Sequence, residues 1–151
     1  MSDINVYLSN LAVWMVKLHN LHWNVTGHAF VQVHEYTESL YNDAFEQYDA
    51  VAELLKMHGK SPLVKMSDYL ANATIEELDA REFTASEVLE IVEADMVKMK
   101  ELATKIRNKA AEKDCFYTQG LFEGYLQDYA KKLWFLHSMM NKPAASCCHR
   151  A

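Results

Sequence analysis

A stretch without Gly or Pro between two glycines decides the fold of this chain. Residues 30–58 read FVQVHEYTESLYNDAFEQYDAVAELLKMH and contain neither Gly nor Pro, and residues 59–62, GKSP, follow at once. Glycine can end a helix in the left-handed conformation, and proline cannot continue one. The stretch therefore predicts one long helix that ends before Gly59.

Three further helices are predicted on either side of this one. Apolar residues in steps of three and four favour a helix over about residues 3–25, which Gly27 ends. The segment Thr84-Ala85-Ser86-Glu87 is a capping box that predicts the start of a third helix. A fourth is expected from about Thr118 to just before Pro143.

The connections indicate how the four helices are arranged. The gaps after the first and third helices are short, whereas roughly 25 residues separate the second helix from the third, which suits a crossover along a bundle. A short extra helix around residues 66–71 fits within that gap. We therefore expect an all-α, ferritin-like four-helix bundle with one long crossover. Residues 1–143 would form a single domain, with residues 144–151 as a disordered tail.

Composition narrows the class of protein further. Only four Gly and two Pro occur among 151 residues, while 50% are hydrophobic and 24% charged, which excludes disordered, collagen-like and disulfide-scaffold chains. The net charge of −6 argues against a dedicated nucleic-acid binder. No basic segment precedes the first apolar stretch, and the three cysteines are an odd set, so we expect no signal peptide, no membrane span and a cytoplasmic location.

The long second helix carries a candidate metal-binding pattern, His34 with Glu38 and Asp49 with Glu53, each pair at i, i+4 spacing. At 100° per residue, positions 38, 49 and 53 lie about 40°, 60° and 100° from His34, so all four share one stripe. His34 and Asp49 are nevertheless about 22 Å apart along the helix axis, too far to reach one ion. A twofold axis near residues 42–44 would bring the two pairs of different subunits together.

Two simpler interpretations compete with a metal site. Charged pairs at this spacing most often lie on a solvated helix face. A hydrogen-bonded His34 in the core is the other interpretation, but it leaves three aligned carboxylates unexplained. The chain contains no Glu-x-x-His, the pattern that builds a di-iron site inside one bundle, so we do not expect a site within a single bundle.

A longer motif surrounds these residues. Residues 21–30 read LHWNVTGHAF, residues 33–35 read VHE, and Tyr41, Asp49, Ala52 and Glu53 follow. This pattern resembles the signature of the Dps-like mini-ferritins, HWN-x-x-G-x-x-F, then LHE, Y and D-x-x-AE, over the 33 residues 21–53 with the spacing intact. The helix lengths and the crossover agree with that family over nearly the whole chain.

The resemblance implies a ferroxidase centre between two subunits related by a twofold axis. Its metal ligands fall on His22, His34 and Glu38 of one subunit and on Asp49 and Glu53 of the other. Glu38 stands where the family usually has Asp, which keeps the charge but adds a methylene. Trp23 matches the tryptophan thought to lie beside the centre and to exchange electrons with it.

The resemblance also implies a reaction and an assembly. Nitrogen and oxygen ligands without a thiolate suit iron, with zinc and manganese as competitors. By resemblance, hydrogen peroxide oxidises two Fe(II) ions to Fe(III) at each centre, and the mineral is stored in a hollow dodecamer that protects against oxidative stress. Two alternatives stay open: a shell that protects DNA, and a shell that binds metal without turning it over because of Glu38. DNA binding is disfavoured, since no Lys or Arg precedes Lys17 and only Lys142 and Arg150 lie near the C-terminus.

Weaker predictions concern the remaining histidines, tryptophans and cysteines. We expect His19 to be a hydrogen-bonded structural residue, and Trp14 and Trp134 to lie in the core. A Cys-Cys-His sequence at residues 147–149 is more simply explained as tail than as a soft-metal site. The family often lines iron-permeable pores with acidic residues near the start of the last helix. The candidates here are Asp114, Glu123 and Asp128.

Overall fold

The structure, a computed structural model, describes residues 2–143 and is dominated by helices. These are α1 (Asp3–Asn24), α2 (Phe30–Met57), α3 (Met66–Asn72), α4 (Ala85–Ala111) and α5 (Phe116–Met139). The predicted four long helices and the short helix in the crossover are confirmed, and α5 begins two residues before its predicted start. The expected tail, residues 144–151, lies outside the described residues. No helix in residues 2–143 is long and apolar enough to cross a membrane.

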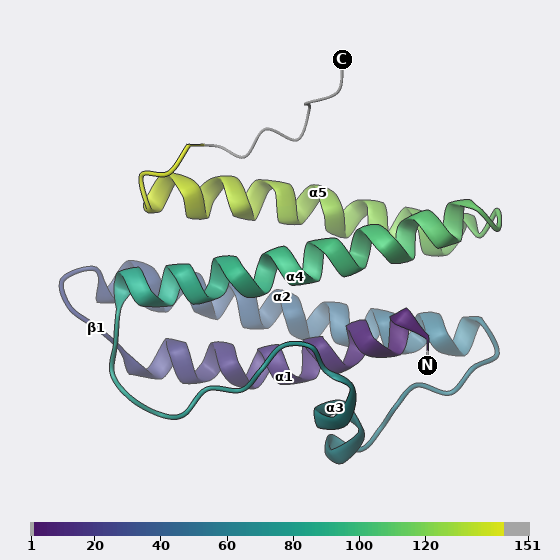
Figure 1. The fold of residues 1–151 in the computed structure, drawn as a ribbon, viewed down its shortest axis with the longest axis horizontal. Coiled ribbons are helices and arrows are strands. Elements are labelled where there is room, and N and C mark those ends of the chain that lie inside the picture. Colours follow the sequence, from purple (N-terminus) through teal and green to yellow (C-terminus); the bar gives the residue numbers. More distant parts are fainter. Residues whose placement is uncertain (1, 144–151) are drawn as a thin grey trace.

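The four long helices form a bundle of two antiparallel pairs (Figure 1). α1 packs against α2 and α4 against α5, while α1 also contacts α3 and α4. After α2 the chain passes through α3 and returns along the bundle to the end where α1 finishes, and α4 begins there. α2 and α4 therefore run in the same direction, as a long crossover requires.

Local signals in the sequence account for the helix ends. The Ser2 hydroxyl caps the start of α1, and Thr84 and Glu87 form the predicted capping box at the start of α4. Gly59 follows α2 with a φ of +68°. That left-handed conformation closes the last turn and favours glycine, so α2 ends where the sequence predicts.

A two-residue parallel pairing holds the end of the bundle that carries His22 and His34. Strand β1 (Val25–Thr26) pairs with β2 (Phe83–Thr84), and Val25 and Phe83 are both buried. The pairing fastens the turn after α1 to the start of α4. Gly27 follows with a φ of +104°, which favours glycine and lets the chain reverse into α2. The end of α1 and the start of α2 are thereby held side by side.

The interior of the bundle is mostly apolar but contains buried polar residues, among them a tyrosine pair and an ion pair. The hydroxyls of Tyr7 and Tyr129 lie 2.6 Å apart, and they lie 2.8 and 3.2 Å from the side-chain oxygen of Gln47. Lys17 and Asp95 form an ion pair of 2.7 Å between α1 and α4. Asp95 is the one buried carboxylate in residues 2–143, whereas an internal di-iron site uses several.

The two tryptophans predicted to be buried differ in exposure. Trp14 is 3% exposed, as expected, but Trp134 is 56% exposed, so its assignment to the core is wrong. The buried side of α5 consists of Thr118, Phe122, Tyr129, Leu133 and Leu136. Trp134 follows Leu133 by one residue, which turns it about 100° away from that side, and it contacts Phe135 instead.

Candidate metal centre

His22 and His34, the predicted imidazole ligands of one subunit, lie side by side. His22 is in the last turn of α1 and His34 in the second turn of α2, so the short connection between these helices brings them together. Their rings stack with 3.6 Å between centroids and 20° between planes. His22 is buried and His34 half-buried, which keeps part of the pair accessible to solvent.

Each of these two histidines is oriented by the backbone of the other. Nδ1 of His22 lies 2.8 Å from the carbonyl oxygen of His34, and Nδ1 of His34 lies 2.9 Å from the carbonyl oxygen of His22. A carbonyl oxygen only accepts hydrogen bonds, so both Nδ1 atoms must donate. In the neutral rings both Nε2 atoms then keep a lone pair. Metal-binding histidines usually donate their other ring N–H to a carbonyl or carboxylate in this way.

Two neighbours on α2 support this arrangement. The buried Thr37 hydroxyl lies 2.9 Å from the backbone oxygens of Val33 and His34 and 3.4 Å from Nδ1 of His22. The Tyr41 ring meets the His22 ring edge to face, with 5.3 Å between centroids. The histidine pair is therefore held from two sides.

Glu38, the predicted carboxylate of the same half-site, lies one turn after His34 on α2 and is exposed. Desolvation, and next the nearby Glu38 carboxylate, raise the pKa of the Tyr41 phenol. Glu38 and Tyr41 are therefore close neighbours beside the histidine pair. Glu38 is one methylene longer than the aspartate expected here, and its carboxylate lies on the solvent side of the histidine pair.

Trp23 lies on the surface next to His19 rather than inside the bundle. Its side chain is 68% exposed, and its ring centroid is 5.4 Å from that of His19. His19 donates from Nδ1 to the carbonyl oxygen of Met15 at 2.7 Å and stacks on Tyr41 at 3.8 Å. The prediction that His19 is a hydrogen-bonded structural residue is confirmed.

Asp49 and Glu53 lie on the exposed side of α2, one turn apart. Since α2 is continuous from Phe30 to Met57, the separation of about 22 Å between positions 34 and 49 applies to this chain. Within residues 2–143, no three His, Cys, Asp or Glu side chains of one chain are grouped so that they could hold a metal ion. The five predicted ligands thus fall into two separate groups on one subunit.

Thr37 is a functional candidate that reasoning from the sequence did not single out. It lies three residues after His34, a spacing that puts two side chains on neighbouring positions of a helix. A threonine three residues after a candidate histidine ligand was the sequence signal that could have identified it. Its burial, which makes the contact with His22 specific, depends on how α1 packs on α2.

Comparison with known proteins agrees with this geometry. The ferritin-like domain family matches residues 2–145. The DNA protection during starvation protein of Brevibacillus brevis is 32% identical over 137 residues, which cover 91% of each chain. The chain is a Dps-like mini-ferritin.

Two further relatives support the assignment of this mini-ferritin. Antigen TpF1 of Treponema pallidum is 32% identical over 134 residues, covering 89% of this chain and 76% of the relative. The X-ray structure of Dps from Listeria monocytogenes superposes with a TM-score of 0.90 at 26% identity, covering 94% of this chain and 93% of the other. The ferritin-like fold predicted from the sequence is confirmed, and the family supports iron storage and protection as the general role.

The predicted donor set of this mini-ferritin suits iron. Two imidazole nitrogens and three carboxylates, with no thiolate, match the ligands that iron accepts, although zinc and manganese bind similar sets. Three carboxylates contribute three negative charges, which offset most of the positive charge of two Fe(II) ions. The chemistry is therefore compatible with binding two iron ions wherever both groups of ligands meet.

Proposed function

We propose that this mini-ferritin oxidises Fe(II) with hydrogen peroxide at centres shared between subunits related by a twofold axis, and that it stores the Fe(III) product in a hollow dodecamer. The observation that carries the proposal is the reciprocal hydrogen bonding of His22 and His34. It leaves the Nε2 atoms of both rings free to bind a metal, which is the usual arrangement of metal-binding histidines.

The exposed side of α2 supports a shared centre. The buried residues of α2, such as Val33, Ala44 and Val51, face the core. The candidate ligands lie on the other side of the helix. Phe45 falls about 20° from His34 on that side and is 65% exposed. A large apolar side chain between two groups of ligands is suited to burial against a second subunit.

A twofold axis crossing α2 near residues 42–44 completes the ligand set. It pairs the His34/Glu38 end of one subunit with the Asp49/Glu53 end of its partner, and it does so twice in one interface. Each centre then has two imidazoles from one subunit and carboxylates from both. Neither subunit alone is expected to oxidise iron at this site.

The overall reaction consumes one peroxide for two irons. Two Fe(II) ions each give up one electron, and H2O2 with two protons becomes two water molecules, so the oxygen–oxygen bond is cleaved without release of a hydroxyl radical. Hard carboxylate oxygens favour the Fe(III) product. Trp23, which follows His22 in the chain and is exposed, is the residue that we propose to exchange electrons with the centre.

Protection of DNA by direct binding is not favoured for this mini-ferritin, although the Brevibacillus brevis relative is named for DNA protection. The net charge is −6, and the first sixteen residues contain no Lys or Arg. Lys142, one of two cations near the C-terminus, pairs with Glu93 at 2.7 Å. Affinity for DNA depends on the number of phosphates that free cations neutralise.

Iron oxidation by matched variants tests the proposed function. Fe(II) is added without oxygen to the assembled protein, peroxide follows, and Fe(III) absorbance is recorded. His34→Ala and Asp49→Ala should each lower the initial rate by at least about tenfold, because each removes a ligand. His28→Ala and Glu101→Ala, which change exposed residues outside the ligand set, should stay within about twofold of wild type. Unchanged rates in a variant carrying both His34→Ala and Asp49→Ala would rule out the site.

A further inference from the structure

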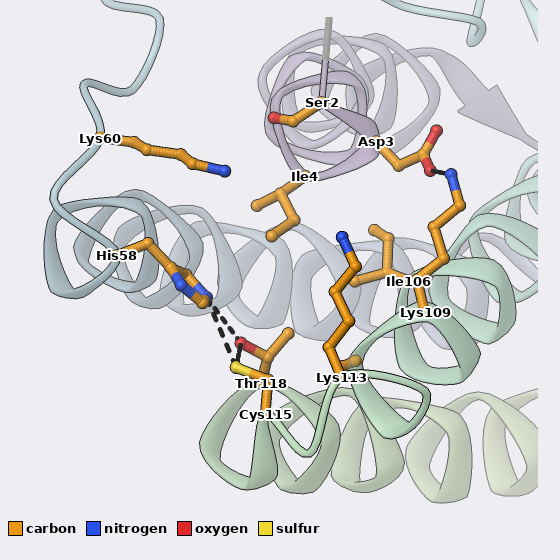
Figure 2. A pocket seen from close by; sticks show the side chains of 11 residues that line it. Ser2, Asp3, Ile4, His58, Lys60, Ile106, Lys109, Lys113, Cys115 and Thr118 are labelled. Carbon is orange, nitrogen blue, oxygen red and sulfur yellow. Dashed lines mark hydrogen bonds and ion pairs between the residues drawn. The ribbon is translucent and has the colours of Figure 1, made fainter.

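A second cluster of reactive side chains lies at the opposite end of α2 from His34. A cavity of about 340 Å³ opens between the end of α2, the start of α1, the end of α4 and the start of α5 (Figure 2). His58, Cys115 and Thr118 form one wall of it, and Ile4 and Ile106 form part of another. Its volume is in the range of small-molecule sites.

Cys115, Thr118, His58 and Tyr117 form a hydrogen-bonded chain. The Cys115 thiol donates to the Thr118 hydroxyl at 3.2 Å, and Sγ lies 3.9 Å from Nε2 of His58. The Thr118 hydroxyl is 2.8 Å from the same Nε2, and the Tyr117 hydroxyl is 3.1 Å from Nδ1. A nucleophile, a base within reach and a third group that orients the base are the elements of an activated thiol.

The backbone places the thiol at the start of a long helix. Asp114 adopts a φ of +52°, and Cys115 follows as the N-cap residue of α5. The helix terminus stabilises a negative charge there. The Thr118 hydroxyl, and next the nearby Tyr117 hydroxyl, lower the pKa of the Cys115 thiol even though desolvation opposes them. Cys115 is half-buried and so remains open to the cavity.

Lysines give this cavity a positive character. Lys60, Lys109 and Lys113 all line it, and in Figure 2 Lys60 and Lys113 extend into the same space as the His58 ring. Lys109 is paired with Asp3 at 2.6 Å. Within residues 2–143, Lys60 and Lys113 form no ion pair with the protein, so they can attract an anion.

We propose that Cys115 undergoes thiol–disulfide exchange with a small disulfide that carries carboxylate groups, which Lys60 and Lys113 attract into the cavity. The Cys115 thiol gives its proton to His58, and the thiolate attacks one sulfur of the disulfide. A new bond forms between Sγ and that sulfur as the original sulfur–sulfur bond breaks. The departing thiolate takes up the proton, so one disulfide is consumed and one small thiol released. This function requires no iron and stands independently of the ferroxidase proposal.

Rates of mixed-disulfide formation test this proposal on the assembled, full-length protein. A background with Cys147→Ser and Cys148→Ser leaves Cys115 as the one thiol of the chain, and adding Cys115→Ser to it provides the blank. Two aromatic disulfides are compared near neutral pH: dithiobis(nitrobenzoate), which is a dianion, and dithiodipyridine, which is neutral. Glutathione disulfide then serves as an aliphatic probe, with the adduct counted by intact mass.

Three variants separate the contributions of charge and base. Lys60→Gln with Lys113→Gln should slow the dianionic probe about 3- to 10-fold and leave the neutral probe within about twofold. The matched control, Lys65→Gln with Lys131→Gln, changes two exposed lysines outside the cavity and should alter neither rate. His58→Gln should slow both probes at least about fivefold, in a protein whose circular dichroism and particle mass match the parent.

Two results would overturn the proposal. One is a Cys115 that fails to react with either probe in the assembled protein. The other is an equal effect of the cavity lysines and the control lysines on the dianionic probe. A glutathione adduct that forms in the background protein and is absent from the Cys115→Ser blank would support it.

Discussion

The hydrogen bonds of the His22 and His34 rings determine which nitrogen of each ring is free to bind a metal. Each Nδ1 is engaged by the carbonyl oxygen of the other residue, at 2.8 and 2.9 Å. Rotating either ring would exchange the free nitrogen and break this pairing. In the proposed centre, this fixed orientation of the two rings reduces the cost of ordering them when an ion binds.

Removing the Thr37 hydroxyl tests whether the orientation of the two histidines matters for metal binding. Thr37→Val removes the oxygen near Nδ1 of His22 and near the His34 carbonyl but keeps the shape of the side chain. We expect Fe(II) affinity, measured by anaerobic titration, to fall by about tenfold, with stability changed by about 1 kcal/mol or less.

A matched threonine serves as the control for that substitution. The Thr104 hydroxyl donates to the carbonyl oxygen of Lys100, one turn earlier on α4, as Thr37 does to Val33 on α2. Thr104→Val should leave Fe(II) affinity unchanged. Equal losses in both variants would mean that Thr37 acts through general helix stability rather than through the histidines.

The identity of the candidate ligands could be predicted from the sequence, but their orientation could not. The spacing of His34, Glu38, Asp49 and Glu53 on one helix already requires two groups of ligands. The bonds between His22 and His34 depend on the close approach of two helices, which no local pattern encodes. Trp134 was misassigned for a similar reason, because its exposure depends on which side of α5 meets the bundle.

Among the elements, α2 is the one whose length matters for function. Gly27 and Gly59 bound it, with φ values of +104° and +68°, and both ends are predictable from glycine and proline positions. The capping box at Thr84 was also predictable. The pairing of β1 with β2 was not, because two residues are too short to show an alternating pattern.

Asp3 links the start of α1 to the end of α4 and gives stability a dependence on pH. Lys109 and Lys105, at 2.6 and 2.9 Å, lower the pKa of this carboxyl below its ordinary value of 3.8. A lowered pKa in the folded state means that the stabilisation is present above pH 3.8 and is lost as the pH falls through the folded value. Asp3→Asn should therefore cost about 0.5–1 kcal/mol at neutral pH and nothing in strong acid.

Urea unfolding at several pH values measures this effect. Lys105→Gln with Lys109→Gln should cost a similar amount at neutral pH, and adding Asp3→Asn to that pair of changes should cost little more, because the interaction is already gone. Fully additive losses would show that Asp3 stabilises α1 through the helix terminus alone.

At the scale of the whole molecule, one subunit holds both groups of candidate ligands but cannot bring them together. His34 and Asp49 lie about 22 Å apart on a rigid helix, and Phe45 lies exposed between them. Because α2 contains no Gly or Pro, it stays straight and keeps the two groups of ligands apart. A helix broken midway could fold its two ends together, whereas this one needs a second subunit to complete the proposed centre.

Co-assembly of two inactive variants tests the shared centre most directly. His34→Ala and Asp49→Ala subunits are unfolded together, mixed in equal amounts and reassembled, and the rate of peroxide-driven Fe(II) oxidation is measured. In a mixed twofold pair, one centre combines the two defects and the other receives an intact residue from each subunit. Half of the pairs are mixed, so about a quarter of the wild-type rate should return. Mixed particles as inactive as either parent would contradict a centre built from two subunits.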